Sequence, residues 1–273
     1  MPTITDSAAL GVELHGVRRE FGDRVILRDI DLTVRAGEIV ALLGASGSGK
    51  STLLRLIAGL DAVDGGRVEL DGSPVREVDQ RCAVAFQEPR LLPWRSLARN
   101  IELGLPRGTA RGPGRARVTG LLELVQLTHA ASLRPRQVSG GMAQRASLAR
   151  ALARGPGILL LDEPFGALDA LTRLTMQDLL VEIHAAEPAT VLLVTHDVDE
   201  ALALADRVIV LGGDAASPWE GSTIRAEITV PGSRPRDRAD TRLASLRGDL
   251  LERLGVDSHR AGTPAGVARL DAF

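Results

Sequence analysis

The chain reads Gly44-Ala45-Ser46-Gly47-Ser48-Gly49-Lys50-Ser51-Thr52 between the apolar run Ile39–Leu43 and a helical pattern. This stretch matches the pattern of a phosphate-binding loop (P-loop) in full. Its glycines allow successive backbone N–H groups to turn toward phosphate oxygens at the positive end of a helix. Lys50 would supply a compact charge to the β- and γ-phosphates, and Ser51 would ligate Mg²⁺.

Lys50 is the only lysine in the chain, where the other long basic side chains are arginines. A lysine at this position has a chemical reason, because an arginine fork is bulkier and differently shaped. A glycine-rich turn that binds nothing would not need the glycines, the Lys-Ser pair and the flanking strand and helix together. The sequence therefore predicts that the chain binds a nucleoside triphosphate.

An apolar strand that ends in two carboxylates, Asp162 and Glu163, is predicted at residues 158–161. In an open parallel sheet, ligands collect at the carboxyl ends of the strands. We expect Asp162 to hold Mg²⁺, directly or through water, and Glu163 to orient and polarise the attacking water. His196 follows the predicted strand 190–195 in the same way, and we expect it to contact the γ-phosphate. An isolated Asp-Glu pair or a lone histidine is more often structural, but these lie in the same predicted sheet as the P-loop.

Composition fits a cytosolic protein with one large α/β domain. The chain has 273 residues, of which 44% are hydrophobic, so a sizeable core can form. The 33 Lys and Arg residues nearly balance the 35 Asp and Glu residues, which argues against a protein held to nucleic acid by bulk charge. No run approaches the ~20 apolar residues of a bilayer-spanning helix, and no signal peptide is recognisable. The single cysteine, Cys82, excludes an intrachain disulfide and fits a reducing compartment.

Short apolar runs alternate with helical patterns, which predicts βαβ units and a parallel sheet. Strands are expected at residues 14–17, 26–34, 39–43 and 67–70, in a partly antiparallel opening region, and at 82–86, 158–161, 190–195, 207–211 and 224–230, the last as an edge strand. Helices are expected at residues 50–60, 96–103, 118–127, 142–152, 170–186, 198–205 and 241–254.

The order of these elements predicts a core interrupted by a helical insertion. Residues 12–90 form the first part of a nucleotide-binding core with an antiparallel β subdomain, residues 91–154 the helical subdomain, residues 155–230 the second part of the core, and residues 231–273 a tail. The segment 106–117, rich in Pro, Gly and Arg, is interpreted as an exposed loop. A solvated loop and a loosely packed tail are favoured for 106–117 and 231–273 over a regulatory or RNA-binding role.

A second motif narrows the class of P-loop protein. Val138-Ser139-Gly140-Gly141-Met142-Ala143-Gln144-Arg145 resembles the signature motif of ABC ATPases. Small residues at the start of a helix make a second phosphate-binding device, to which Ser139 adds a hydroxyl. The commonest form of the motif has Leu and Gln where this chain has Val138 and Met142, while the Ser-Gly-Gly core is intact.

Other elements of the ABC ATPase family occur in the expected order, and the resemblance spans about residues 14–211. Phe21 is similar to the aromatic residue that stacks on adenine, commonly a Tyr. Gln87 is similar to the glutamine that senses Mg²⁺ and the attacking water. Ala167-Leu168-Asp169 resembles the D-loop, preceded by Gly166 where many members have Ser, and His196 matches the switch histidine.

This resemblance implies a P-loop NTPase fold with a RecA-like α/β core, an antiparallel β subdomain and a helical subdomain. It implies that Glu163, His196 and Gln87 are catalytic, and that Ser51, Gln87 and Asp162 hold Mg²⁺. Two copies would close head-to-tail around two ATP molecules, with Ser139, Gly140, Gly141 and Asp169 contributing to the nucleotide sites. Hydrolysis would reopen the pair and move partner subunits.

Three further stretches are similar to ATPases that energise import of sulfonates, nitrate or taurine, and most of all aliphatic sulfonates. They begin at Gln87, Gly166 and Val194 and read Gln-Glu-Pro-Arg-Leu-Leu-Pro-Trp, Gly-Ala-Leu-Asp-Ala-Leu-Thr-Arg and Val-Thr-His-Asp-Val-Asp-Glu-Ala. The resemblance implies a transmembrane permease, a solute-binding protein that acts through it, no nucleic acid, and a peripheral position on the cytoplasmic face of the membrane. Residues 91–94 are either core of the helical subdomain or part of the permease-docking surface.

Several alternatives remain from the sequence. The first alternative function is the ATPase of an importer of nitrate, taurine or bicarbonate. The second is an ABC exporter or a lipid-extracting ATPase. A chromosome-maintenance ABC ATPase would need a long coiled coil, for which residues 53–139 are too few. A translation-type ABC factor would carry two cassettes, and a P-loop kinase or GTPase would not need Ser139-Gly140-Gly141.

Overall fold

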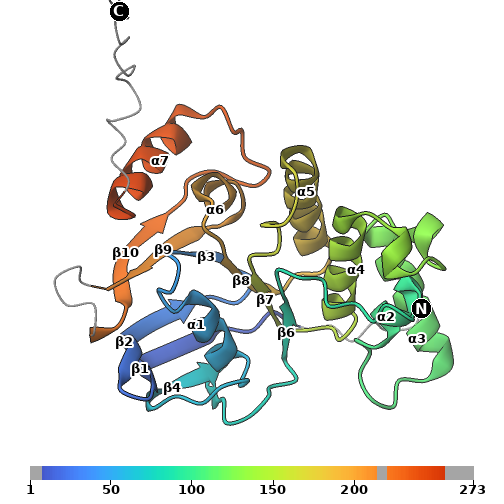
Figure 1. Ribbon diagram of the computed structural model, residues 1–273, viewed down its shortest axis with the longest axis horizontal. Helices are drawn as coiled ribbons and strands as arrows, with labels where there is room; N and C mark the ends of the chain where they lie inside the picture. The colour runs from blue at the N-terminus through green and yellow to red at the C-terminus, as the bar shows by residue number, and fades with distance from the viewer. Residues whose placement is uncertain (1–7, 214–219, 256–273) are drawn as a thin grey trace, which may run out of the picture.

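The computed structural model describes residues 8–213 and 220–255, and shows an α/β fold built on two sheets (Figure 1). The four-stranded antiparallel sheet has the order β2-β1-β4-β5, and the six-stranded sheet has the order β10-β9-β3-β8-β7-β6. In the first sheet the strands are β1 (Val12–Phe21), β2 (Arg24–Val34), β4 (Gly65–Leu70) and β5 (Ser73–Pro74). In the second they are β3 (Ile39–Leu43), β6 (Cys82–Ala85), β7 (Ile158–Asp162), β8 (Thr190–Val194), β9 (Arg207–Gly212) and β10 (Thr223–Thr229).

The six-stranded sheet is parallel from β9 to β6. β10 lies at its edge, as the sequence predicts, and pairs with β9 in the antiparallel direction. β3 lies in this sheet, between β9 and β8, and not in the antiparallel one. Its alternate residues face two separate hydrophobic clusters, with Ile39, Ala41 and Leu43 on one side and Val40 and Leu42 on the other. A parallel strand buried on both faces reads as an unbroken apolar run. β3 is such a run throughout, and β7 and β8 are apolar at four of their five residues.

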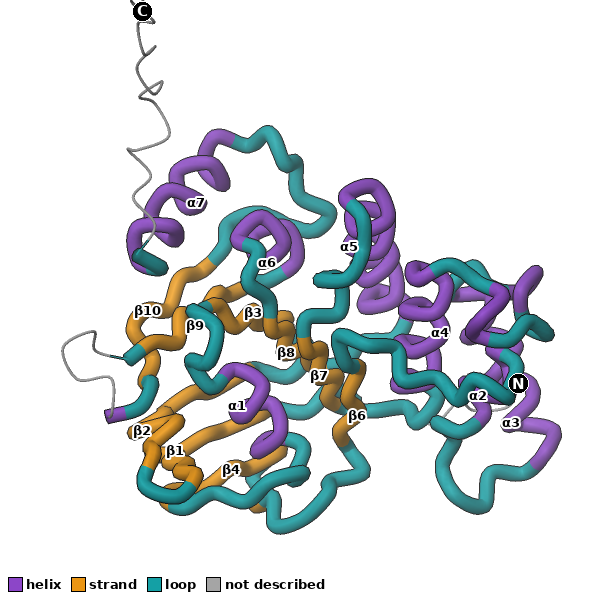
Figure 2. The backbone as a smooth tube through the Cα atoms, in the orientation of Figure 1, coloured by secondary structure: helices purple, strands orange, loops and turns teal. Residues whose placement is uncertain are grey.

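The helices are α1 (Lys50–Ile57), α2 (Leu97–Glu102), α3 (Arg111–Leu124), α4 (Gly140–Leu152), α5 (Ala170–Ala186), α6 (Val198–Leu204) and α7 (Thr241–Arg253), with 3₁₀ turns at Thr128–Ala130 and Pro135–Gln137. Figure 2 shows α2, α3 and α4 gathered beyond β6, on the opposite side of the molecule from the antiparallel sheet. α1 packs into the cluster that joins the two sheets, since Leu53, Leu54, Leu56 and Ile57 are all buried there. No helix within the described ranges is both long enough and apolar enough to span a bilayer.

The prediction of an exposed loop over 106–117 is wrong for its second half. α3 begins at Arg111, directly after Ala110. Pro113 is the third residue of this helix, where its missing N–H has no intrahelical partner to lose. Proline and glycine in the first turn therefore concealed the true start of the helix.

The prediction of a loosely packed tail is wrong for residues 231–255, the part of the tail inside the described ranges. The side chain of Arg236 is almost fully buried and donates to the carbonyl oxygens of Leu202 and Ala203, at the end of α6, at 3.2 and 3.3 Å. Arg234 donates to the next carbonyl, of Leu204, at 2.9 Å. The carbonyls at a helix end have no intrahelical partner, so these two arginines satisfy groups that α6 leaves open.

Candidate functional site

The P-loop links the buried end of β3 to the first turn of α1, and glycine is required at two of its positions. A Cβ atom on Gly44 would lie 2.3 Å from the carbonyl oxygen of Leu211. Gly49 has φ +86°, and a Cβ there would lie 2.6 Å from Leu27 of β2. By contrast, no atom lies within 4 Å of the same position on Gly47, so this side of the loop is open. The loop therefore packs against the sheets on one side and presents backbone on the other. Of its remaining residues, Ala45 and Ser46 are exposed, Ser48 is buried and Thr52 is half-buried in α1.

Lys50 is held inside this loop, with a relative exposure of 6%. Its Nζ donates to the carbonyl oxygens of Gly44 and Ala45 at 2.8 and 2.9 Å. Burial lowers the pKa of Lys50, while the negative charges of Glu163 and Asp162 act in the opposite direction. The cation thus lies within the influence of both carboxylates at the end of β7.

Ser51 and Asp162 meet directly. The Ser51 hydroxyl donates to Oδ1 of Asp162 at 2.8 Å, across 111 residues of sequence. Burial raises the pKa of Asp162, and the hydrogen bond from Ser51 opposes that rise. A hydroxyl and a carboxylate side by side are oxygen donors of the kind that Mg²⁺ prefers, so the residues present fit this ion.

Glu163, His196 and Gln87 converge next to them. Glu163 has φ +46°, a left-handed conformation that is uncommon for a residue with a side chain. Nδ1 of His196 lies 3.3 Å from Oε2 of Glu163, although the His196 side chain is 64% exposed. A Cβ on Gly166 would lie 3.3 Å from Nε2 of Gln87 and 3.6 Å from Oε2 of Glu163. Glycine at 166 therefore leaves room for the amide of Gln87, whereas the distance to Glu163 is an ordinary contact.

The signature segment and Asp169 meet at a residue that the sequence did not single out, Thr172. Ser139 caps α4 by accepting from the N–H of Met142 at 3.2 Å, and both Ser139 and Gly140 are exposed. A Cβ on Gly141 would lie 2.6 Å from Cγ2 of Thr172. Asp169 accepts from the N–H and the hydroxyl of the same threonine, at 3.0 and 2.6 Å, and these bonds lower its pKa.

These residues stand apart from the P-loop of the same chain. In Figure 1, α4 and α1 lie on different sides of strands β6 and β7. Phe21 is separate again, at the end of the β1–β2 hairpin, where it is 48% exposed and has the guanidinium of Arg19 4.5 Å from its ring centre. The fold thus assembles Lys50, Ser51, Asp162, Glu163, Gln87 and His196, and leaves Phe21 and the Ser139–Gly141 segment on other surfaces.

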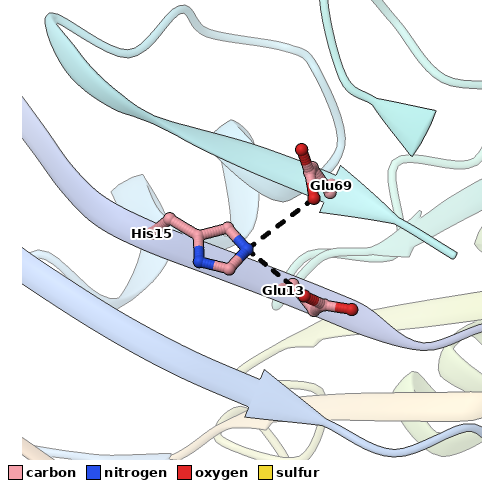
Figure 3. Close-up of side chains that lie close together, drawn as sticks. All are labelled: Glu13, His15 and Glu69. Carbon is pink, nitrogen blue, oxygen red and sulfur yellow. Dashed lines mark ion pairs between the residues drawn. The ribbon is translucent and has the colours of Figure 1, made fainter. Parts of the chain in front are cut away.

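A different group of possible metal ligands, Glu13, His15 and Glu69, lies on the antiparallel sheet (Figure 3). Glu13 and Glu69 are directly opposed on β1 and β4, an arrangement in which like charges repel. Nε2 of His15 lies 3.2 Å from Glu13 and 3.7 Å from Glu69, and Arg67 approaches Glu69 at 2.9 Å. Because Arg67 already neutralises one carboxylate, we assign these residues to a half-exposed ion-pair cluster. His15 of this cluster also borders a hollow of about 580 Å³ between β1, β2, β9 and β10. This hollow is separate from the P-loop.

Comparisons with known proteins agree with these motifs. The family described as ABC transporter matches residues 27–166. The chain is 50% identical over 252 residues to aliphatic sulfonates import ATP-binding protein SsuB 1 of Streptomyces avermitilis, covering 92% of this chain and 89% of that protein. It is 51% identical over 245 residues to SsuB of Granulibacter bethesdensis, covering 90% and 94%.

A solved structure supports the fold. It is the dimeric, post-hydrolysis structure of the ATP-binding cassette MJ0796 bound to ADP and Pi, with a TM-score of 0.68 and 32% identity over 81% of this chain and all of that one. The architecture is that of a P-loop ABC ATPase, as the sequence predicts. The chain therefore belongs to the ABC transporter family, among its ATP-binding proteins.

Proposed function

We propose that this chain is the ATP-hydrolysing subunit of an importer that moves a small organic anion, most directly an aliphatic sulfonate, through a separate membrane permease. The observation that carries the ATPase is the convergence of Lys50, Asp162 and Glu163 at one sheet edge. The cargo rests on about 50% identity, over some nine-tenths of the chain, to proteins named as aliphatic sulfonate import ATPases.

The site would hold ATP and Mg²⁺ with separate groups. The open backbone of residues 44–52 and Lys50 would bind the phosphates, and Phe21 would stack on adenine. Ser51 and Asp162, together with Gln87, would hold Mg²⁺. When bound, this ion neutralises charge on the phosphate oxygens.

Glu163 would act as general base. Its carboxylate contacts His196 and its charge acts on Lys50, and it would accept a proton from a water that attacks the γ-phosphate. The 3.3 Å contact with His196 would fix its carboxylate, and the glutamine amide would orient the same water. The signature segment would not serve the site of its own chain but that of a second copy, through exposed Ser139 and Gly140, with Asp169 nearby.

The chain would divide into subdomains as follows: residues 12–90 and 155–230 would form the core, 91–154 the helical part and 231–273 the tail.

The partners of the chain would meet it at its helical part. Leu91 packs against the core, whereas Trp94 is 67% exposed and would contribute to the surface that meets the permease. A solute-binding protein would act through that permease. This chain would lie at the cytoplasmic face of the permease, and no nucleic acid would take part.

Glu163→Gln tests the enzyme. This variant should bind ATP normally and lower its turnover by about 10²–10⁴-fold, the usual effect of removing a positioned base. Glu182→Gln, an exposed glutamate on α5, is the matched control and should hydrolyse ATP at the parental rate. Parental turnover by the Glu163 variant would refute its assignment as the base.

Growth tests the cargo. A strain lacking this protein should fail to grow on an alkanesulfonate as sole sulfur source and grow normally on sulfate. Wild type and Arg55→Ala, an exposed change on α1, should restore growth, and Lys50→Ala should not. Normal growth of the deletion strain on sulfonate, in a background without a second sulfonate importer, would refute sulfonate as the cargo and favour nitrate, taurine or another small solute.

A further inference from the structure

A small cavity lies directly beside Glu163 and His196. It has room for about one water molecule. Its walls come from the ends of β7 and β8, the start of α5 and the first turn of α6, and they are Glu163, Gly166, Arg173, Thr195, His196, Asp197 and Glu200. Four of these residues have no part in the site described so far, among them Arg173 of α5 and Glu200 of α6.

Each of the two carries a buried polar atom that lacks a hydrogen-bond partner among residues 8–213 and 220–255: Oε1 of Glu200 and Nε of Arg173. Glu200 is only 3% exposed. The rest of the Arg173 guanidinium is engaged, with Asp197 at 3.1 Å and with the carbonyl of Leu168 at 3.3 Å. A buried acceptor and a buried donor without partners are costly and rare in folded proteins. One water in the cavity could satisfy both, because a buried water commonly makes about three hydrogen bonds.

Burial, together with nearby negative charges, favours the neutral form of Glu200. Burial is the main cause of a rise in the pKa of Glu200 to about 8, and the negative charges of Asp197 and Glu163 add to it. The positive charge of Arg173 and a hydrogen bond with Thr195 oppose the rise. His196 also faces the cavity, while Asp199 on the same helix points to Arg247 of α7, at 2.9 Å. A neutral carboxyl group can both donate to and accept from a shared water.

The same residues support the loop that carries His196. The N–H of Asp197 donates to the hydroxyl of Thr195 at 3.0 Å, and the Asp197 carboxylate accepts from the N–H groups of Asp199 and Glu200 at 2.9 and 3.1 Å. His196 itself is mostly exposed, so its ring is held mainly by the backbone beneath it and by the contact with Glu163. Arg173 and Glu200 line the same cavity as that loop, and both bond to Asp197, the residue that follows His196.

We propose that Glu200 is a positioning residue: through one water shared with Arg173, it fixes the loop that carries His196 and thereby the pair of His196 and Glu163. This inference rests on the proposed ATPase function and assigns it two further residues. Glu200 does not touch substrate. It acts on the geometry of the two residues that would.

Steady-state ATP hydrolysis by the full chain between pH 6 and 9.5 tests the proposal. Glu200→Leu removes the polar group and should lower kcat by roughly 10- to 100-fold with little change in KM for ATP, because a small misplacement of catalytic groups has that effect. Glu200→Gln keeps a neutral group that both donates and accepts, and should restore most of kcat. Wild-type kcat should decline above about pH 8, as Glu200 ionises beside Glu163, and this decline should be absent in Glu200→Gln. Asp199→Asn, its exposed neighbour, is the matched control and should behave as wild type.

Two results would overturn the proposal: parental kcat in a folded Glu200→Leu, or the same alkaline decline in wild type and Glu200→Gln. If Glu200→Leu fails to fold, the pH profiles of kcat for wild type and Glu200→Gln still test the proposal. Failure of the proposed function looks different. In that case wild type hydrolyses no ATP, or Glu163→Gln hydrolyses it at the parental rate.

Discussion

Replacing Glu200 by Gln should change how the stability of the protein depends on pH. The ordinary pKa of a glutamate is near 4.5, and in the folded protein that of Glu200 is raised to about 8 by burial. Between these two values the unfolded chain has released a proton that the folded chain still holds. The free energy of unfolding therefore falls as the pH rises through this window, and levels off above about pH 8.

The size of the effect follows from the shift. A difference of about 3.5 pKa units, at ~1.4 kcal/mol for each unit, corresponds to roughly 5 kcal/mol between pH 4.5 and pH 8. Glutamine does not titrate, so the variant lacks this contribution. The stability of Glu200→Gln relative to wild type should thus rise with pH across the window by up to that amount.

Urea unfolding at intervals between pH 5 and 9, on both proteins, measures this difference. Taking the difference removes the contributions of the other titratable groups, because these groups are common to both chains. Asp199→Asn serves as the control, and its difference from wild type should be nearly flat. A flat difference for Glu200→Gln as well would show that Glu200 ionises normally in the folded state and would refute the reasoning.

Two further predictions concern the sheet and the tail. Burial raises the pKa of the only thiol, Cys82, from 9.0 to about 12, so its thiolate fraction at pH 8 is on the order of 10⁻⁴ in the folded chain and 10⁻¹ in the unfolded one. Alkylation of the folded protein should be slower by about 10³-fold than that of the urea-unfolded protein, and equal rates would contradict the buried position. Arg236→Met should lower the free energy of unfolding by about 1–3 kcal/mol because it strips the carbonyls of Leu202 and Ala203 of their donors. Exposed Arg242→Met is its control, and an equally small loss in both would disprove the role of Arg236 at the end of α6.

Much of the fold could be read from the sequence because its signals are local. Buried parallel strands are short apolar runs, and those at 158–161 and 207–211 end within one residue of β7 and β9. α5 has the predicted bounds, Ala170–Ala186, where Asp169 caps the first turn. The start of α3 cannot be predicted in the same way, because its first turn contains glycine and proline, which ordinarily indicate a break. These residues are tolerated in a first turn only because of their position within the helix.

Part of the candidate site could also be predicted from short stretches of sequence. The P-loop, the carboxylates after β7 and the histidine after β8 are each recognisable in a few residues, and strand order alone predicts that they share a sheet edge. What the sequence could not supply is contact between residues far apart in the chain. The hydrogen bond of Ser51 to Asp162, the meeting of Gly141 and Asp169 at Thr172, and the arginines of the tail on α6 all depend on how distant segments pack.

Glu200 is the clearest case of this limit. In the sequence it is an acid in the first turn of a helix, which ordinarily means a solvated carboxylate near the positive end of the helix dipole. Only the packing of α5 and the loop after β8 around α6 removes its solvent and places Glu163 and Arg173 near it. Its protonation is therefore a property of the tertiary structure, because desolvation depends on every segment that surrounds a group and no single stretch of sequence encodes it.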